Sequence, residues 1–154
     1  MANNYLQFST LIKISDITAK WAKKFVGSSE HLEMLRIQEP DLYDEDDELY
    51  LPFEFDCVDG GILIYDEESG DAEFAAITIQ RILQKEYQFF EENVVEDPTY
   101  ANNIVTLSWA ATCSRPRPDE FFGGIILISR KEIRFQPYAA WIKTNSAEMI
   151  EQLL

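Results

Sequence analysis

The sequence predicts an α+β protein in which helices cover one face of a mainly antiparallel sheet. Three observations support this prediction. Short apolar segments rich in β-branched residues recur along the chain, segments with helical spacing separate them, and a glycine turn joins two of the short segments directly. The chain has 154 residues, which suits a single domain, 1–154, because two hydrophobic cores would each be small.

The first two elements are a strand and a helix. Residues 5–14 alternate in part between apolar and polar side chains, which favours a strand. Ser15 is a good N-cap for the helix that follows, and Gly27 suits its end. Three lysines fall away from the core, and the inward face of this helix should carry Ile17, Trp21, Ala22, Phe25 and Val26.

A second helix and a hairpin come next. We expect a short helix over 30–36 and then a loop over the acidic stretch 39–48. Residues 49–56 alternate again, and the glycine turn at 59–61 precedes the apolar run 62–65. These two segments should therefore pair as a hairpin.

A longer helix is expected to start after Asp71, which can cap it, and to run to about Lys85. Residues 86–102 are polar and are expected to be irregular. The inward side chains of the helix should be Phe74, Ala75, Ile77, Thr78, Ile82 and Leu83.

The last part of the chain should add strands and a final helix. Three strands are expected over 103–112, 121–129 and 131–135. Asn145, with Glu148 three residues later, fits a capping box for a helix at the C-terminus. The first six elements match the ferredoxin-like βαββαβ arrangement, with extra strands and a helix after it.

The acids of the chain are concentrated in one window. The chain has 28 Asp and Glu against 13 Lys and Arg, a net charge of −15, and the window 37–80 holds fifteen of the acids and no base. The rest of the chain is therefore neutral. So acidic a protein is a poor candidate for direct binding to nucleic acid through a basic face.

Acids placed this close together repel one another, so folding alone gives no reason to gather them. The window is a solvated loop that keeps the protein in solution, a surface for a cationic partner, or a divalent-metal site. Neither 44–48 nor 66–71 has the glycine and distal glutamate of a calcium loop, so we expect no metal and no cofactor. The partner-binding residues that we predict are Asp44, Glu45, Asp46, Asp47, Glu48, Asp66, Glu67 and Glu68.

A second candidate surface lies in the proline-stiffened segment between the predicted strands 103–112 and 121–129. Its arginines either pair with the protein's own acids or form a contact surface. The segment also follows Cys113, and nearby cations lower the pKa of a thiol. A small enzyme with a site near Cys113 is therefore a further alternative. A Cys-x5-Arg phosphatase would need an arginine where Asp119 stands, and we predict no catalytic residue. The residues of this second surface are Cys113, Arg115, Arg117 and Glu120.

The remaining reactive side chains are few. His31 is the only histidine, lies in a polar run, and is expected at the surface without the context of a catalytic base. Cys57 and Cys113 lie outside any CxxC spacing, and we expect both to be buried thiols in a reducing compartment. The uncharged stretches are too polar to span a membrane, and the start of the chain lacks a basic segment before an apolar one. We therefore expect a cytoplasmic protein without membrane contact.

Two segments carry a resemblance to other proteins. The segment 108–124, SWAATCSRPRPDEFFGG, and the segment 61–70, GILIYDEESG, resemble a family of small acidic proteins from bacteria, phages and plasmids, over roughly 49–141. The sequence departs from that family's pattern at Phe122, where a third glycine is expected, and it shows no clear match from Asn145 onward. The family brings no established activity. The resemblance therefore implies a prokaryotic or mobile-element setting and transfers no catalytic residues.

The charge window also predicts a function. Duplex DNA presents one charge per roughly 1.7 Å of its axis, and a folded protein with clustered carboxylates can occupy a site built for that polymer. We predict a non-enzymatic inhibitor that mimics nucleic acid and binds a basic nucleic-acid-binding protein. An anti-defence (anti-CRISPR-like) protein of a phage or mobile element, acting on a host nuclease, is such an inhibitor. The alternatives are an immunity protein that neutralises a cationic toxin and the small enzyme near Cys113.

Overall fold

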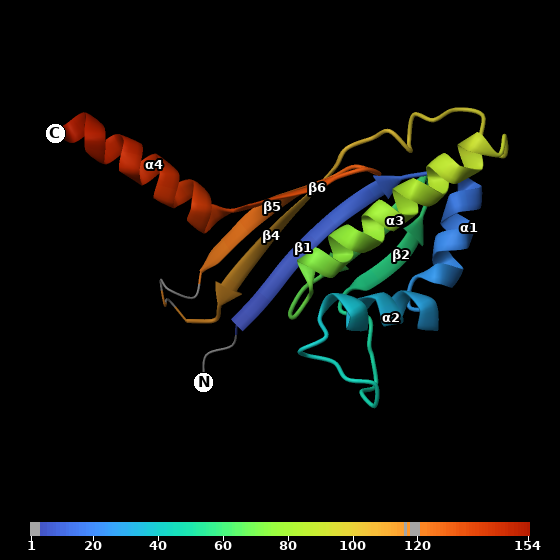
Figure 1. The fold of residues 1–154 in the computed structure, drawn as a ribbon, viewed down its shortest axis with the longest axis horizontal. Helices are drawn as coiled ribbons and strands as arrows, with labels where there is room; N and C mark the ends of the chain where they lie inside the picture. Colours follow the sequence, from blue (N-terminus) through green and yellow to red (C-terminus); the bar gives the residue numbers. More distant parts are fainter. Residues whose placement is uncertain (1–3, 116, 118–120) are drawn as a thin grey trace.

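The computed structural model describes residues 4–115, 117 and 121–154. Within them, six strands form one antiparallel sheet in the order β2-β3-β1-β4-β5-β6, and four helices accompany it (Figure 1). The α+β class predicted from the sequence is confirmed. The strands are β1 (Asn4–Lys13), β2 (Glu54–Val58), β3 (Gly61–Asp66), β4 (Val105–Cys113), β5 (Phe122–Ile128) and β6 (Ile133–Pro137). The helices are α1 (Asp16–Phe25), α2 (Ser29–Gln38), α3 (Ala72–Glu91) and α4 (Tyr138–Leu153).

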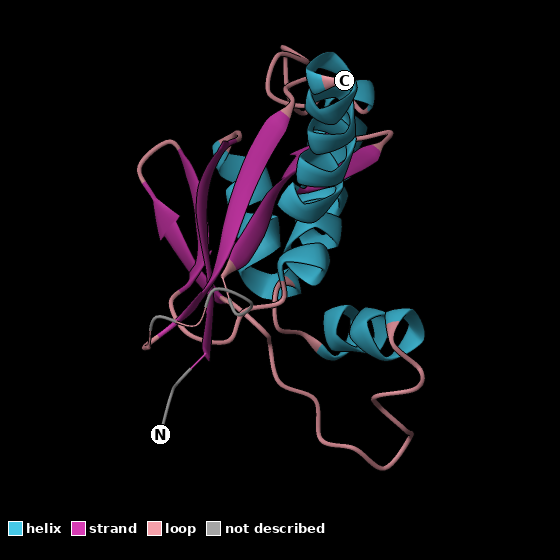
Figure 2. Cartoon of the chain, turned by 90° about the vertical axis from the view of Figure 1, so that its left-hand side faces the viewer, coloured by secondary structure: helices cyan, strands magenta, loops and turns pink. Residues whose placement is uncertain are grey.

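The topology of the first four strands is ferredoxin-like. Strand β1 lies between β3 and β4 and is antiparallel to both. The helical connection from β1 to β2 therefore passes over β3, and the connection from β3 to β4 passes over β1, as in the ferredoxin-like arrangement. The hairpin strands β5 and β6 extend the sheet beyond β4. Helices α1 and α3 contact each other and pack on the sheet, and Figure 2 shows helices gathered beside it. The strand residues that point to the other face, such as Leu11, Ile125 and Leu127, are exposed.

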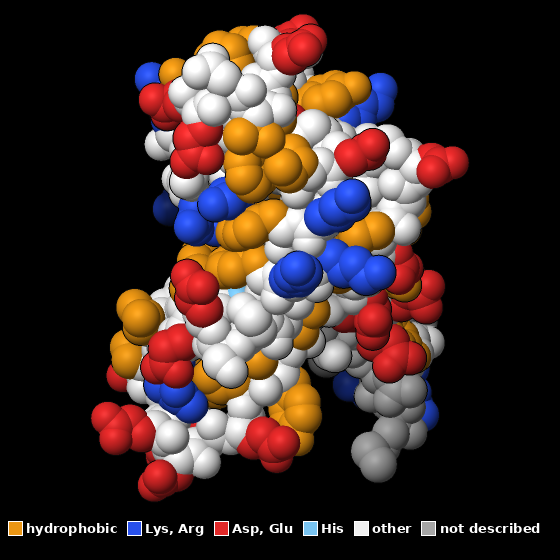
Figure 3. All heavy atoms as spheres, turned by 90° about the vertical axis from the view of Figure 1, so that its right-hand side faces the viewer, with side chains coloured by type: hydrophobic (Ala, Val, Ile, Leu, Met, Phe, Trp, Pro, Cys, Tyr) orange, Lys and Arg blue, Asp and Glu red, His pale blue; other side chains and the backbone are white. Residues whose placement is uncertain are grey.

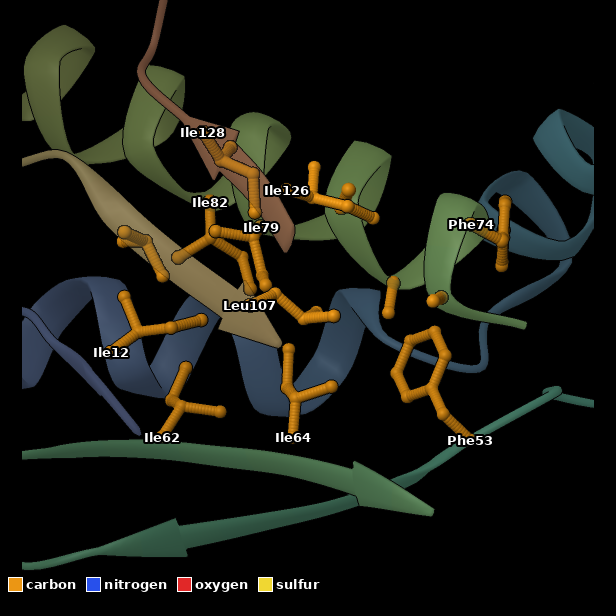
Figure 4. Close-up of a cluster of buried hydrophobic side chains, with 14 of the residues drawn as sticks. Ile12, Phe53, Ile62, Ile64, Phe74, Ile79, Ile82, Leu107, Ile126 and Ile128 are labelled. Carbon is orange, nitrogen blue, oxygen red and sulfur yellow. The ribbon is translucent and has the colours of Figure 1, made fainter. Parts of the chain in front are cut away.

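The core lies between the sheet and α3. Side chains along a strand alternate between the two faces, so every second residue of β1, β3, β4 and β5 points at this helix. Burying one large aliphatic side chain contributes about 1.5–3 kcal/mol, and the cluster holds the layers together. Figure 4 labels its main members, which include Ile12, Ile62, Ile64, Leu107, Ile126, Ile128, Phe74, Ile79 and Ile82.

The predicted helix caps are present, but one works differently from expectation. Asp71 accepts the backbone N–H of Phe74 at 2.9 Å and caps α3 as predicted. Ser15 is the N-cap of α1, yet its hydroxyl donates to Glu86 Oε2 at 2.7 Å, and its backbone N–H donates to Glu86 Oε1 at 3.1 Å. The hydroxyl of Thr18 also donates to Glu86. A carboxylate from α3 therefore accepts the hydrogen bonds of the donors at the start of α1.

Two predicted helix boundaries were wrong. Helix α3 continues to Glu91, so 86–91 is not irregular, because Glu86 is held in place by its bonds to Ser15 and Thr18. Helix α4 begins at Tyr138, and Asn145 lies inside it with its Nδ2 donating to the Trp141 carbonyl at 2.8 Å. The predicted capping box therefore does not exist.

Three further predictions, in α1, in α3 and at the start of β2, also fail. Ile17 is 38 % exposed and does not point into the core, because Thr18 occupies the buried position. Ile77 is only half-buried, whereas Ile79 takes the core position that the spacing had missed. Strand β2 begins at Glu54 rather than at 49, because the chain before it belongs to the loop that returns from α2.

The two predictions for His31 and Cys57 are also wrong. His31 is fully buried, because α2 folds back so that its first turn meets α3, and the ring stacks on Phe74 with centroids 4.8 Å apart. Cys57 is exposed, because β2 is a short strand at the edge of the sheet and pairs with β3 on one side only. Cys113 is a buried free thiol, as predicted.

Helix α4 leaves the sheet after β6 and runs away from the body of the molecule (Figure 1). Within the described residues, no helix is both long enough and apolar enough to cross a lipid bilayer.

Candidate functional site: an acidic end of the sheet

Three parts of the acidic window meet at the first turn of α3. The backbone N–H of Asp71 donates to the carbonyl of Pro52 at 2.9 Å, which ties the end of the loop after α2 to this turn. The start of the same loop lies there too, because Glu39 lines one hollow together with Asp71 and Glu73, and burial and the charges of these two acids raise the pKa of its carboxyl. Residues 39–52 therefore leave and return at the N-terminus of α3.

The loop that joins β3 to α3 is also fixed in place. The Leu6 backbone N–H donates to the Glu68 carbonyl at 2.8 Å, which anchors the loop on β1. Asp66 Oδ1 accepts the backbone N–H groups of Glu68 and Ser69, both at 2.9 Å. Asp66 therefore shapes the loop, whereas the carboxylates of Glu67 and Glu68 are exposed to solvent.

The loop 44–48 divides its acids in the same way. Asp44 Oδ1 accepts the backbone N–H of Asp46 at 2.9 Å, and Asp47 Oδ2 accepts that of Asp44 at 2.7 Å. Arg36 from α2 donates to the carbonyls of Asp44 and Asp47 at 2.9 and 3.0 Å. Asp44 and Asp47 therefore hold the loop, and the carboxylates of Glu45, Asp46 and Glu48 are exposed without such a role in the described structure.

A further group of acids surrounds Tyr65 on the open face of the β2–β3 hairpin. Glu54 lies across from Tyr65 in the register, and the Tyr65 hydroxyl donates to Asp56 Oδ2 at 3.1 Å. The hydrogen bond to Asp56 raises the pKa of Tyr65, and the charges of Asp56, Glu54 and Glu67 raise it further. Sequence reasoning did not select Glu54 and Asp56, although the predicted hairpin register carried the signal.

The ion pairs recorded among the described residues do not involve the acids of the window. Burial raises the pKa of Glu39 above its usual value, and the neighbouring charges of Asp71 and Glu73 add to the increase. The salt bridges found among the described residues are Arg36 with Glu33 and Arg134 with Glu132, and both acids lie outside the window. Repulsion between carboxylates is therefore a property of this surface.

Several bases instead lie against aromatic rings on the far side of the helical layer. The guanidinium carbon of Arg81 is 5.5 Å from the centre of the Trp21 ring, and the Lys85 ammonium is 5.4 Å from it. Figure 3 shows this side of the molecule, where Lys and Arg side chains gather in the middle and acidic side chains lie around them. Arg81 and Lys85 therefore contact an aromatic ring within the helical layer.

Shallow hollows adjoin the loop 66–71. One hollow of about 390 Å³ is lined by Glu54, Tyr65 and the residues from Asp66 to Ser69. A second, of about 360 Å³, has Trp109 and Phe135 at its floor and is edged by acids of the loop after α2 and of the first turn of α3. An apolar floor with a charged rim is the usual layout of a protein-binding surface. We call this surface the acidic end, and it comprises Glu39, Glu54, Asp56, Glu67, Glu68, Asp71 and Glu73.

The structure brings together part of the predicted site. Glu67 and Glu68 belong to the acidic end, and Asp66 supports them. The loop 44–48 is a separate acidic arm fixed by Arg36, and within the described residues no hydrogen bond or ion pair joins it to 66–68. Asp59 lies at the other end of the hairpin, because Val58 pairs with Gly61 where Glu54 pairs with Tyr65. None of the fifteen acids in the window is buried.

The second predicted surface is only partly described. Cys113 is buried at the end of β4, and Arg115 and Arg117 are exposed, whereas Glu120 lies outside the described residues. A cavity of about 330 Å³ opens nearby, but Ala111 and Thr112 line it rather than Cys113. The structure gives no support to catalysis by this thiol.

No group of three or more His, Cys, Asp or Glu side chains among the described residues is arranged to hold a metal ion. Comparison of the chain with models of protein families, with curated proteins and with solved structures finds no match. The resemblance to small acidic proteins of bacteria, phages and plasmids therefore stays a prediction.

Proposed function

We propose that this protein is a non-enzymatic inhibitor that places its carboxylates in the nucleic-acid site of a basic partner. The proposal depends chiefly on one observation: acids from three chain segments gather at the acidic end without bases to neutralise them. Such a cluster costs folding free energy through repulsion, so a contact with cations offers a reason for it.

The way the loops are held also supports the proposal. Asp66, Asp44 and Asp47 bond to backbone N–H groups of their own loops, so the neighbouring acids sit on ordered rather than freely moving segments. A preorganised charged surface loses less conformational entropy on binding than a flexible tail does. It also attracts a cationic partner at a rate that falls with salt concentration.

The hollows beside the acidic end add an apolar component. Trp109 and Phe135 lie at the floor of one hollow, and buried aromatic side chains supply much of the affinity in protein interfaces. Nucleic acid offers charge and stacking surfaces in one ligand, and this arrangement reproduces both. We place the inhibitor in the cytoplasm of a prokaryotic host, as an anti-defence protein of a phage or mobile element directed at a nuclease.

The test uses two variants with the same net charge. Glu54, Glu67, Glu68 and Glu73 are changed to Lys in the first variant, and a matched control changes the exposed acids Glu30, Glu91, Glu92 and Glu96 to Lys. Each protein is immobilised and exposed to a bacterial lysate, and retained proteins are eluted with rising salt and then with duplex DNA. The wild type and the control should retain a nucleic-acid-binding protein that duplex DNA displaces, and the first variant should lose it.

Two results would count against the proposal. Equal loss of binding in both variants would show that only bulk charge matters, and equal retention would show that the acidic end is not the contact. The purified partner is then assayed for nucleic-acid cleavage with increasing amounts of this protein. Inhibition that duplex DNA competes away supports mimicry, whereas a retained toxin without nucleic-acid affinity would redirect the assignment to an immunity protein.

A further inference from the structure

Helix α4 packs little against the rest of the fold. No residue of α4 is buried, whereas each of the other three helices of the described structure buries at least two. Only its start is fixed, where the Tyr138 ring lies so close to Gly123 that a Cβ there would approach it to 2.9 Å. The rest of the helix extends away from the sheet (Figure 1) and exposes large apolar side chains at Trp141, Ile142, Met149, Ile150 and Leu153.

Three of these apolar residues, Ile142, Met149 and Leu153, lie in a stripe with the spacing of a helix-pairing seam. The positions that repeat at intervals of three and four are Ala139, Ile142, Ser146, Met149 and Leu153. An isolated helix of 16 residues has little stability in water from propensity alone, so this stripe needs a surface to cover it.

The exposed area is large enough for a stable interface. The chain exposes 10042 Å², whereas a compact monomer of 17.9 kDa is expected to expose about 8,000 Å². The excess of about 2,000 Å² is more than the roughly 800 Å² that each partner buries in an interface of standard size.

Charge determines which occupant is compatible with this surface. Helix α4 contains one base, Lys143, and two acids, Glu148 and Glu151, a net charge of −1, although the whole chain carries −15. Two copies of so acidic a protein repel each other least at a surface of low charge, and α4 provides one. A lipid surface is a poor alternative, because an interfacial helix is usually rich in Lys and Arg, whereas α4 has only Lys143.

We infer that α4 pairs with α4 of a second copy of this chain in a twofold arrangement. A twofold axis presents the same stripe to itself, so one amphipathic helix is sufficient to form both halves of the interface. Because the acidic end lies on other elements, each copy keeps it free. This inference does not depend on the proposed function.

Sedimentation equilibrium of the full chain tests the inference over a range of concentrations. The expected mass at high concentration is twice 17.9 kDa. Ile142→Glu should raise the dissociation constant of the dimer at least tenfold, and Ser146→Leu, which fills the middle of the stripe, should lower it. The matched controls are Ile37→Glu on α2, at a side chain 74 % exposed, and Thr144→Leu on the opposite side of α4. Both controls should leave the constant unchanged.

A monomeric wild type at all concentrations would overturn the inference. A dimer that Ile142→Glu leaves intact would overturn it as well, because the interface would then lie elsewhere. Flotation of the monomer with phosphatidylglycerol vesicles would instead assign α4 to a lipid surface. The far-UV circular dichroism of each variant establishes that a change in mass does not come from unfolding.

Discussion

The imidazole Nε2 of His31 lies 2.7 Å from the hydroxyl of Thr78, in the buried space between α2 and α3. Nδ1 of the same ring accepts the backbone N–H of Gly27 at 3.0 Å, so the ring proton must be on Nε2 and is donated to Thr78. The Thr78 hydroxyl then donates to the Phe74 carbonyl at 2.9 Å. These hydrogen bonds require a single ring proton, on Nε2. A second proton, on Nδ1, would break the bond that Gly27 donates to the ring.

Acid should therefore destabilise the fold through His31. Burial lowers the pKa of His31 from 6.5 to about 4. The unfolded chain takes up the proton below about pH 6.5 and the folded chain only below about pH 4, so the free energy of unfolding falls as the pH drops through this interval. The full loss is of the order of 3 kcal/mol and is complete below pH 4.

Urea unfolding at pH 7.5 and pH 4.5 measures this loss, with His31→Gln as the comparison. The carboxylates of the chain have their own pH dependence, so the quantity to compare is the difference between the wild type and the variant. The wild type should lose more stability than His31→Gln between the two pH values. The same loss in both proteins would show that the ring is not held neutral by its surroundings.

Glu86 should be among the most important polar side chains for stability. Its carboxylate is fully buried and accepts from the backbone and hydroxyl of Ser15 and from Thr18. Glu86→Ala leaves the backbone N–H of Ser15 without its acceptor and leaves the hydroxyls of Ser15 and Thr18 only each other, at 3.1 Å, which should lower the free energy of unfolding by about 2–3 kcal/mol. Chemical denaturation measures this free energy. The control is Glu91→Ala, which removes an exposed acid of the same helix and should change the free energy of unfolding by less than about 0.5 kcal/mol.

The acidic end should reduce stability in the absence of a partner. The raised pKa of Glu39 means that its ionised form is disfavoured in the folded protein beside Asp71 and Glu73. Glu39→Gln should therefore raise the melting temperature at pH 7 by about 1–3 °C in low salt, where charges are screened least. The difference should shrink in 0.5 M NaCl. A lower melting temperature in the variant would mean that the carboxyl of Glu39 stabilises the loop.

Local signals in the sequence predicted much of the fold. Asp71 was predicted to cap α3 from residue type and position alone, and the glycine turn predicted the β2–β3 hairpin, where Gly60 has a φ of +79°. Partial alternation predicted the strand over 5–14, which the structure places at Asn4–Lys13. Each of these features depends on interactions within a few residues, so a single segment carries the information.

The features that were missed depend on contacts between distant segments. His31 lies in a polar run, and its burial follows from a partner 47 residues away in Thr78. The polar continuation of α3 looked irregular because Glu86 has its partners about 70 residues earlier in the chain. The cluster around Tyr65 emerges only after the hairpin register places Glu54 opposite it. The sequence window therefore predicted an acidic surface but not which acids share it.

The two thiols should differ sharply in reactivity. Cys57 is exposed on the edge strand β2, whereas Cys113 is buried at the end of β4. A thiol must reach solvent to react with a disulfide reagent, so native protein should release one equivalent of thionitrobenzoate quickly and the second only on unfolding. Cys57→Ser should remove the fast phase, and Cys113→Ser should leave it unchanged. Rapid reaction of Cys113 in folded Cys57→Ser would revive the alternative of an enzyme that uses this thiol.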